Sequence, residues 1–213
     1  MEEMRLSKEE QDFIQGLRHE VSSLLYHWSL FVQLYGKNEN VDVLIEVNDQ
    51  FFGAVQQLLW DYVLLTIGKL IDHDKTKGHE NLSFKNSLVL LSKRRSADQM
   101  ADLKKDLETL IEKCELIKTI RHKRLAHFGK EYMIKRLNQE PLKGVNRTTI
   151  EEALALIKKI MSDIEKSFGW VMLGYDAEDH FVGDELLWYL KESGSYKEVR
   201  EKAEVKKMRE LGF

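Results

Sequence analysis

The chain has 213 residues, of which 43% are apolar and 32% charged, the balance of a folded helical protein rather than of a disordered one. A single proline, Pro141, leaves long stretches without a helix breaker, and a single cysteine, Cys114, excludes an intrachain disulfide framework and a cysteine zinc site. The net charge of −3 excludes a generally basic surface, so any contact with a nucleic acid must be local.

Two long helices are predicted in the first third of the chain. Apolar residues recur at steps of three and four from about Lys8 to Tyr35, and Gly36 follows as a stop. The second helix covers Val41–Ile71 and is closed by the polar run Asp72–Asn81. Its predicted inner face consists of Leu44, Val47, Phe51, Val55, Leu58, Leu59, Tyr62, Leu65 and Leu70.

Two helices are predicted in the middle of the chain. The first follows Leu82, with Ser83 as its N-cap and with Leu88, Leu90 and Leu91 buried. The second runs from about Ala97 to Phe128, and Gly129 is placed to end it.

Three further helices are predicted after the loop that contains Pro141. Thr148–Glu151 has the pattern of a capping box that opens a helix to about Leu173. The last two are expected near Asp184–Glu192 and Tyr196–Leu211.

These elements predict an all-α fold, a compact up-and-down bundle of about five to seven helices. No internal repeat or linker divides the chain, so we expect one domain over residues 1–213, with a core at about 8–175 and a C-terminal helical extension at about 176–213. The N-terminus lacks the features of a signal peptide, and polar residues interrupt the most apolar window, Phe51–Ile71. We therefore expect a soluble cytoplasmic protein with no membrane segment.

The predicted helix Ala97–Phe128 carries an arginine in an unexpected place. Its buried stripe consists of Leu103, Leu107, Leu110, Cys114 and Ile117. On a helical wheel of about 100° per residue, Arg121 falls on this stripe and His127 lies about 120° away. A guanidinium there costs several kcal/mol unless it meets an anion, a carboxylate or water. Two interpretations stay open: an internal ion pair with an acidic residue, or a cleft in which Arg121 and His127 face a phosphodiester.

The segment around Arg121 is basic within an acidic chain. Residues 118–136 hold one acid, Glu131, and seven basic residues: Lys118, Arg121, Lys123, Arg124, Lys130, Lys135 and Arg136. Such a run favours contact with a phosphate backbone.

The stretch Arg121–His127 resembles the motif of the HEPN superfamily, an arginine followed by a polar residue and then by a histidine near a helix end. Arg121-x5-His127 fits this pattern, with His122 at the polar position. Over roughly residues 17–170 the chain resembles the abortive-infection AbiU-type branch, through Leu58–Asp72, Asn81–Ser83 and Lys123–His127.

The resemblance implies a helical domain that dimerises, so that two copies of the motif face each other across a shared cleft. In active members this cleft cuts RNA without a metal, whereas other members are inactive structural or regulatory copies. An arginine binds two phosphoryl oxygens with its planar fork, and a histidine transfers protons near neutral pH. We therefore assign Arg121 to the phosphate and His127 to proton transfer, with no metal and no cofactor. Supporting or RNA-binding roles are predicted for His122, Lys123, Arg124 and Lys130.

Two functions from different classes stay open. The first is a homodimeric, metal-independent endoribonuclease of a phage-defence or toxin system, which cleaves RNA by transesterification through the 2′-hydroxyl and is controlled by an antitoxin or another regulatory partner. The second is a non-catalytic helical module that binds RNA, a nucleotide or a protein partner through the same basic cleft.

Acidic residues and histidines, which can be metal ligands, also occur close together in the sequence at Asp72–His79 and Asp176–His180. Charged side chains are ordinary in predicted loops, so no metal site is predicted there.

Overall fold

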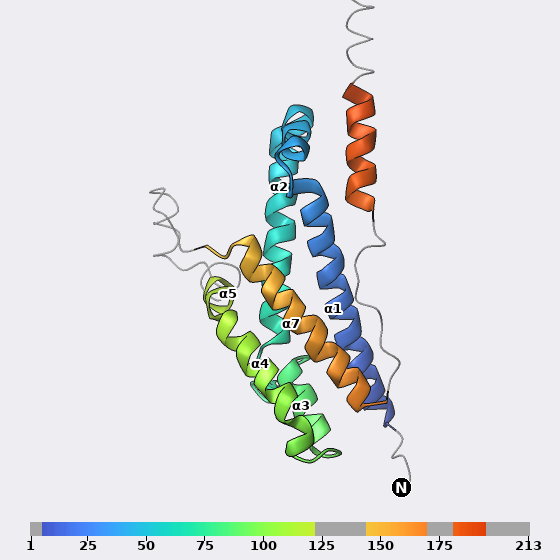
Figure 1. The fold of residues 1–213 in the computed structure, drawn as a ribbon, viewed down its shortest axis with the longest axis vertical. Coiled ribbons are helices and arrows are strands. Elements are labelled where there is room, and N and C mark those ends of the chain that lie inside the picture. Colours follow the sequence, from blue (N-terminus) through green and yellow to red (C-terminus); the bar gives the residue numbers. More distant parts are fainter. Residues whose placement is uncertain (1–5, 122–143, 170–180, 195–213) are drawn as a thin grey trace, which may run out of the picture. The chain divides into compact units, whose positions relative to one another are not determined.

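The computed structural model describes residues 6–121, 144–169 and 181–194 (Figure 1). Nearly every element in these ranges is a helix, which confirms the predicted all-α fold. The exception is an antiparallel hairpin of two short strands, β1 (Lys75–Thr76) and β2 (His79–Glu80). None of the described helices is both long and apolar enough to cross a membrane.

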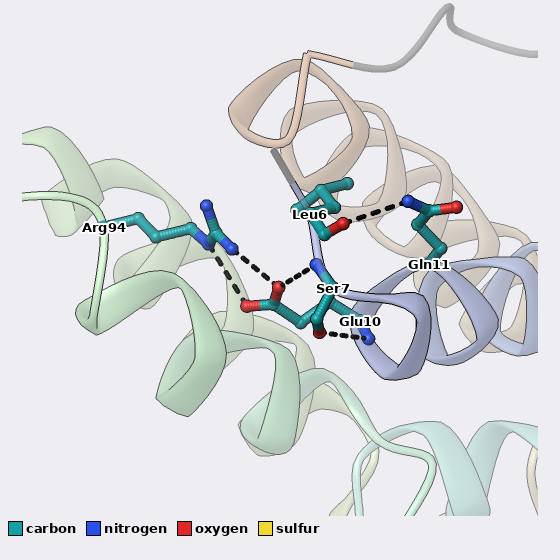
Figure 2. A network of polar contacts seen from close by, with 5 residues as sticks. All are labelled: Leu6, Ser7, Glu10, Gln11 and Arg94. Carbon is teal, nitrogen blue, oxygen red and sulfur yellow. Dashed lines mark hydrogen bonds and ion pairs between the residues drawn. The ribbon is translucent and has the colours of Figure 1, made fainter. Parts of the chain in front are cut away.

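The first helix, α1, runs from Lys8 to Tyr35, as its apolar periodicity predicted. A capping box fixes its start (Figure 2): the Ser7 hydroxyl accepts from the Glu10 N–H at 3.2 Å, and the Glu10 carboxylate accepts from the Ser7 N–H at 2.8 Å. The same carboxylate accepts from Arg94 at 2.6 Å, which anchors the start of α1 to a segment 84 residues away.

The second helix, α2 (Asn38–Leu70), contains a break that the sequence pattern did not reveal. Asn48 has extended backbone geometry, with φ −169° and ψ 97°. Its side-chain oxygen accepts from the Phe51 N–H at 2.9 Å, so Asn48 caps the second part of the helix. An asparagine suits this position because its side chain replaces a backbone partner that the break removes.

The predicted inner face of α2 is wrong at three positions. Val47, Phe51 and Leu58 are exposed, whereas Phe52, which was not on the predicted face, is buried. The prediction assumed one unbroken helix, and an extended residue interrupts the repeat on which that assumption depends. Among the other predicted positions, Leu44, Leu59 and Leu70 are buried.

The short helix α3 (Phe84–Ser92) starts as predicted, because the Ser83 hydroxyl accepts from the Asn86 N–H at 3.3 Å. Of the three leucines predicted to be buried, only Leu91 is fully buried, while Leu88 and Leu90 are half-buried.

The predicted helix Ala97–Phe128 is divided in the structure. A short 3-10 turn, η1 (Asp98–Met100), leads into α4 (Ala101–Lys113), and α5 (Glu115–Ile120) follows. Between them Cys114 leaves helical geometry, with ψ near 9°. The predicted stripe nevertheless stays buried across the division at Leu103, Leu107, Leu110, Cys114 and Ile117.

The helix α7 (Arg147–Ser167) begins and ends earlier than predicted. Its N-cap is Asn146, whose side chain accepts from the Thr149 N–H at 2.8 Å, and not the expected Thr148. After Ser167 the chain reaches Gly169, whose φ of 71° is left-handed geometry that stops a helix. The helix predicted near Asp184–Glu192 is confirmed at residues 182–194, whereas the predicted helix Tyr196–Leu211 lies outside the described residues.

The chain divides into two compact units. Unit 1 comprises residues 1–25 and 61–176, and unit 2 comprises residues 26–60 and 177–213. In unit 1, α4 and α7 lie side by side (Figure 1). The ion pairs Lys113–Glu152 at 2.6 Å and Lys159–Asp106 at 2.7 Å show that the two helices are antiparallel, since the later residue of one pairs with the earlier residue of the other.

Unit 2 has a small core of its own. Its described buried cluster consists of Leu34, Leu44, Phe52, Leu59 and Leu187. Beside it Trp28 stacks on Phe31 with ring centroids 5.4 Å apart. The Tyr35 hydroxyl donates to the Phe52 carbonyl at 2.8 Å. Burial raises the pKa of this phenol to about 12.

Candidate functional site

Arg121, the arginine singled out by the sequence, lies at the end of α5 in unit 1 and keeps about a quarter of its side chain exposed (26%). Its Nη1 donates to the Gly68 carbonyl at 2.8 Å, and its Nη2 pairs with the Asp72 carboxylate at 2.7 Å. Gly68 lies in the last turn of α2 and Asp72 lies just after this helix, both more than 45 residues earlier in the sequence. The internal ion pair, one of the two interpretations left open by the sequence, is therefore present.

Gly68 provides the space in which the arginine side chain lies. A Cβ added to this glycine would stand 2.5 Å from Arg121 Cδ, far inside van der Waals contact. The overlap falls on the middle of a side chain whose end is bound at two points, so the clash is not relieved by moving a free tip. An alanine at residue 68 would thus force Arg121 out of its present position.

Asp72 lies between α2 and the β-hairpin, and the chain after it is held by side-chain bonds. The Asn81 side chain donates to the His73 carbonyl at 2.8 Å and to the Thr76 hydroxyl at 2.7 Å. The Ser83 hydroxyl donates to the same His73 carbonyl at 3.2 Å. These bonds tie the segment next to Asp72 to the start of α3, so the carboxylate sits on an ordered part of the chain.

The guanidinium of Arg121 keeps binding capacity beyond these contacts. An arginine has five N–H donors, and the two bonds formed within the described residues use two of them. The side chain is also partly exposed, so an oxyanion can reach it from solvent. Gly68 and Asp72 thus hold the guanidinium on two of its nitrogens, and other N–H donors remain to which a phosphate can bind.

The other predicted site residues are His122, Lys123, Arg124, His127 and Lys130, and all of them lie outside the described residues. The structure therefore places Arg121 and does not place its predicted partner His127. Of the seven basic residues between positions 118 and 136, it describes two, and both have acidic partners: Lys118 pairs with Glu115 at 2.7 Å, and Arg121 pairs with Asp72.

Cys114, on the stripe that leads to Arg121, is fully buried. Burial raises the pKa of its thiol to about 11, and since the thiolate is the nucleophilic form, this cysteine is inert at neutral pH. Within the described ranges no cluster of three or more histidine, cysteine or carboxylate side chains could hold a metal ion. Asp72, a member of the acidic and histidine-containing stretch noted in the sequence, is engaged with Arg121.

Sequence reasoning missed two residues of the arginine site, Gly68 and Asp72. A signal for Gly68 existed, because an isolated glycine inside a helical pattern costs about 1 kcal/mol relative to alanine and often has a packing reason. Nothing in the pattern linked Asp72 to Arg121, since the contact joins residues 49 positions apart.

Comparison with known proteins gives one family. The model of the HEPN family described as AbiU2 matches residues 8–182, a span that includes Gly68, Asp72, Arg121 and His127. No curated protein and no solved structure matches the chain.

Proposed function

This chain belongs to the AbiU2 family of HEPN-domain proteins, an abortive-infection family, and from that premise we propose that it is a metal-independent endoribonuclease that acts in the cytoplasm as part of a phage-defence or toxin system. The proposal assigns phosphate binding to Arg121 and proton transfer to His127. It includes a regulatory partner, such as an antitoxin, that restrains the activity.

The observation that carries the proposal is the state of Arg121. Its guanidinium is bound at two points to Gly68 and Asp72, is partly exposed and has further N–H donors that no contact within the described residues uses. A cation that is oriented before the substrate arrives stabilises developing negative charge without the cost of reorganisation. This state suits the binding of a phosphate during its reaction.

The proposed reaction needs no metal. The 2′-oxygen of a ribose forms a bond to phosphorus while the bond from phosphorus to the 5′-oxygen breaks, which leaves a 2′,3′-cyclic phosphate and a 5′-hydroxyl. One histidine takes the proton of the 2′-hydroxyl, and a second gives a proton to the departing 5′-oxygen. In a dimer the two copies of His127 would divide these roles, while Arg121 binds the non-bridging oxygens.

A homodimer is the second part of the proposal, and the surface of unit 2 supports it. Nine of the ten large hydrophobic side chains exposed in the described ranges lie in this unit: Ile45, Val47, Phe51, Leu58, Phe181, Val182, Leu186, Trp188 and Tyr189. From Gln50 to Trp60 no residue is charged, although 32% of the chain is. The uncharged stretch 50–60 exposes Phe51 and Leu58, and it presents no cation to RNA and no like charges to a second copy of itself.

The second candidate function, a non-catalytic module that binds RNA, a nucleotide or a protein, agrees equally well with the described part of the basic run. Lys118 and Arg121, the two described members of the basic run, are each compensated by a carboxylate. Such pairs suit a binding surface as well as a catalytic one.

The experiment that separates the two functions is a cleavage assay with analysis of product ends. We would incubate the protein and its Arg121→Ala and His127→Ala variants with a labelled single-stranded RNA in EDTA. Arg147→Ala is the control, because it removes a half-exposed arginine of the same unit that pairs with Glu151. We expect 2′,3′-cyclic phosphate ends from the wild type and the control, and losses of about 10² to 10⁴ in the two site variants. Intact RNA in every reaction, with binding retained, would favour the binding module.

A further inference from the structure

We propose that Gly68 and Asp72 are positioning residues for Arg121, which set the orientation in which its guanidinium meets a phosphate. This inference rests on the proposed ribonuclease function. It adds two residues to the candidate site, for which the sequence motif had supplied only residues between Arg121 and His127.

Three contacts define the orientation of the arginine. The absent Cβ of Gly68 admits the side chain at Cδ, the Gly68 carbonyl accepts from Nη1, and the Asp72 carboxylate accepts from Nη2. Two acceptors bound to different nitrogens fix the plane of the fork, whereas a single acceptor would leave it free to rotate. The direction of the unused donors is therefore set before a substrate binds.

The exposure of the pair argues for this role over a purely structural one. The side chains of Arg121 and Asp72 are 26% and 35% exposed, and ion pairs in contact with solvent contribute little to stability. Gly68, in the last turn of α2, loses more backbone entropy on folding than an alanine would, yet an alanine there would overlap with Arg121. Both features affect the position of the Arg121 side chain more than the stability of the fold.

The role of Asp72 can be tested by the sign of its effect. If the carboxylate acted only through its charge, then its removal would make the site more positive, tighten RNA binding and leave the rate unchanged or raised. If the carboxylate positions Arg121, then kcat falls on its removal while KM stays the same or falls. A residue that only supports folding would change neither constant per folded molecule.

The first test compares Asp72→Asn with Asp74→Asn in the full-length protein. The control removes the same charge two residues further along, where the described contacts involve the Asp74 backbone and not its side chain. We expect kcat to fall at least about tenfold in Asp72→Asn, as displaced catalytic groups do, with KM not raised and with circular dichroism unchanged. Equal kcat in both variants would overturn the role of Asp72, and so would a higher kcat in Asp72→Asn, which would make it an inhibitor of Arg121.

The second test uses a double-mutant cycle for Gly68. Gly68→Ala is expected to lower kcat, but the same change made in an Arg121→Ala background is expected to leave the residual rate unchanged, since its effect passes through the arginine. Equal reductions in both backgrounds would show that Gly68 acts elsewhere and would overturn its role.

A third measurement keeps the inference separate from the proposed function. Nitrogen-detected NMR of arginine side chains reports whether a guanidinium rotates freely, and it needs no catalysis. We expect restricted rotation for Arg121 in the wild type and free rotation in Asp72→Asn and Gly68→Ala. If the wild type fails to cut RNA but shows this pattern, then the positioning stands and the ribonuclease function fails. Free rotation in the wild type would overturn the positioning itself.

Discussion

The contact of Glu10 with Ser7 and Arg94 allows a quantitative prediction about stability (Figure 2). Glu10 completes the capping box of α1 and also accepts two bonds from Arg94, at 3.2 Å from Nε and at 2.6 Å from Nη2. The two side chains are only 13% and 16% exposed, so solvent screens them less than a surface pair. We expect Glu10→Gln to lower the free energy of unfolding by about 1–2 kcal/mol at pH 7.

The loss should depend on pH in a defined direction. The Arg94 guanidinium, which donates to the carboxylate, holds the pKa of Glu10 below its ordinary value of 4.5. A group whose pKa is lowered by folding stabilises the folded state above its unfolded pKa, and this contribution disappears as the pH falls through the folded pKa. The difference between wild type and Glu10→Gln is therefore expected to be full at pH 7 and to shrink below about pH 4.5.

Thermal or urea unfolding followed by circular dichroism measures both effects, and a chain of this size should lose about 2–4 °C in Tm for each kcal/mol. The matched control is Glu9→Gln, which removes the same charge from the same first turn at an exposed position. A Glu10→Gln variant as stable as Glu9→Gln at pH 7, or a difference that does not diminish in acid, would refute this account of the contact.

Three other predictions follow from features away from the arginine site. If unit 2 binds a second copy, then Leu58→Glu should convert a dimer to a monomer in light-scattering chromatography, whereas Val89→Glu, an exposed change in unit 1, should not. Asn48→Ala, which removes the cap at the break of α2, should cost about 1 kcal/mol in urea unfolding, and an unchanged midpoint would contradict the capping role. Cys114 should react with a thiol reagent at pH 8 only after denaturant is added, because the native thiol is buried and its pKa is raised to about 11.

The sequence predicted the elements that are governed by local patterns. The bounds of α1 and the Ser83 cap of α3 agree with the structure, and so does the buried stripe from Leu103 to Ile117, because periodicity and capping involve residues a few positions apart. The prediction from sequence failed where a helix is interrupted inside a continuous run of apolar residues. At Cys114 the buried stripe continues across the break, whereas at Asn48 the break shifts the buried face, and a count of apolar residues on one assumed helix finds neither break.

The same reasoning from local sequence patterns predicted only part of the arginine site. Helical phase showed that Arg121 needed a partner, because its position coincided with a buried stripe. The identity of the partner depends on how α2 packs against α5 in unit 1, and 36 acidic residues were available to choose from. Gly68 and Asp72 could be found only from the three-dimensional contact, which joins segments about 50 residues apart.

The two interpretations of Arg121 that the sequence left open are compatible with each other. An ion pair and a phosphate site would compete if both needed the same donors, but Asp72 and Gly68 occupy two of five and leave the side chain partly exposed. A phosphate that approaches the remaining donors meets a cation whose orientation is already fixed by its contacts with Gly68 and Asp72. The neighbouring carboxylate reduces the attraction felt at a distance, so this arginine contributes more through its geometry than through long-range charge. For that reason the orientation of its guanidinium, and not the net charge of the segment, is the property through which Asp72 and Gly68 would act on RNA cleavage.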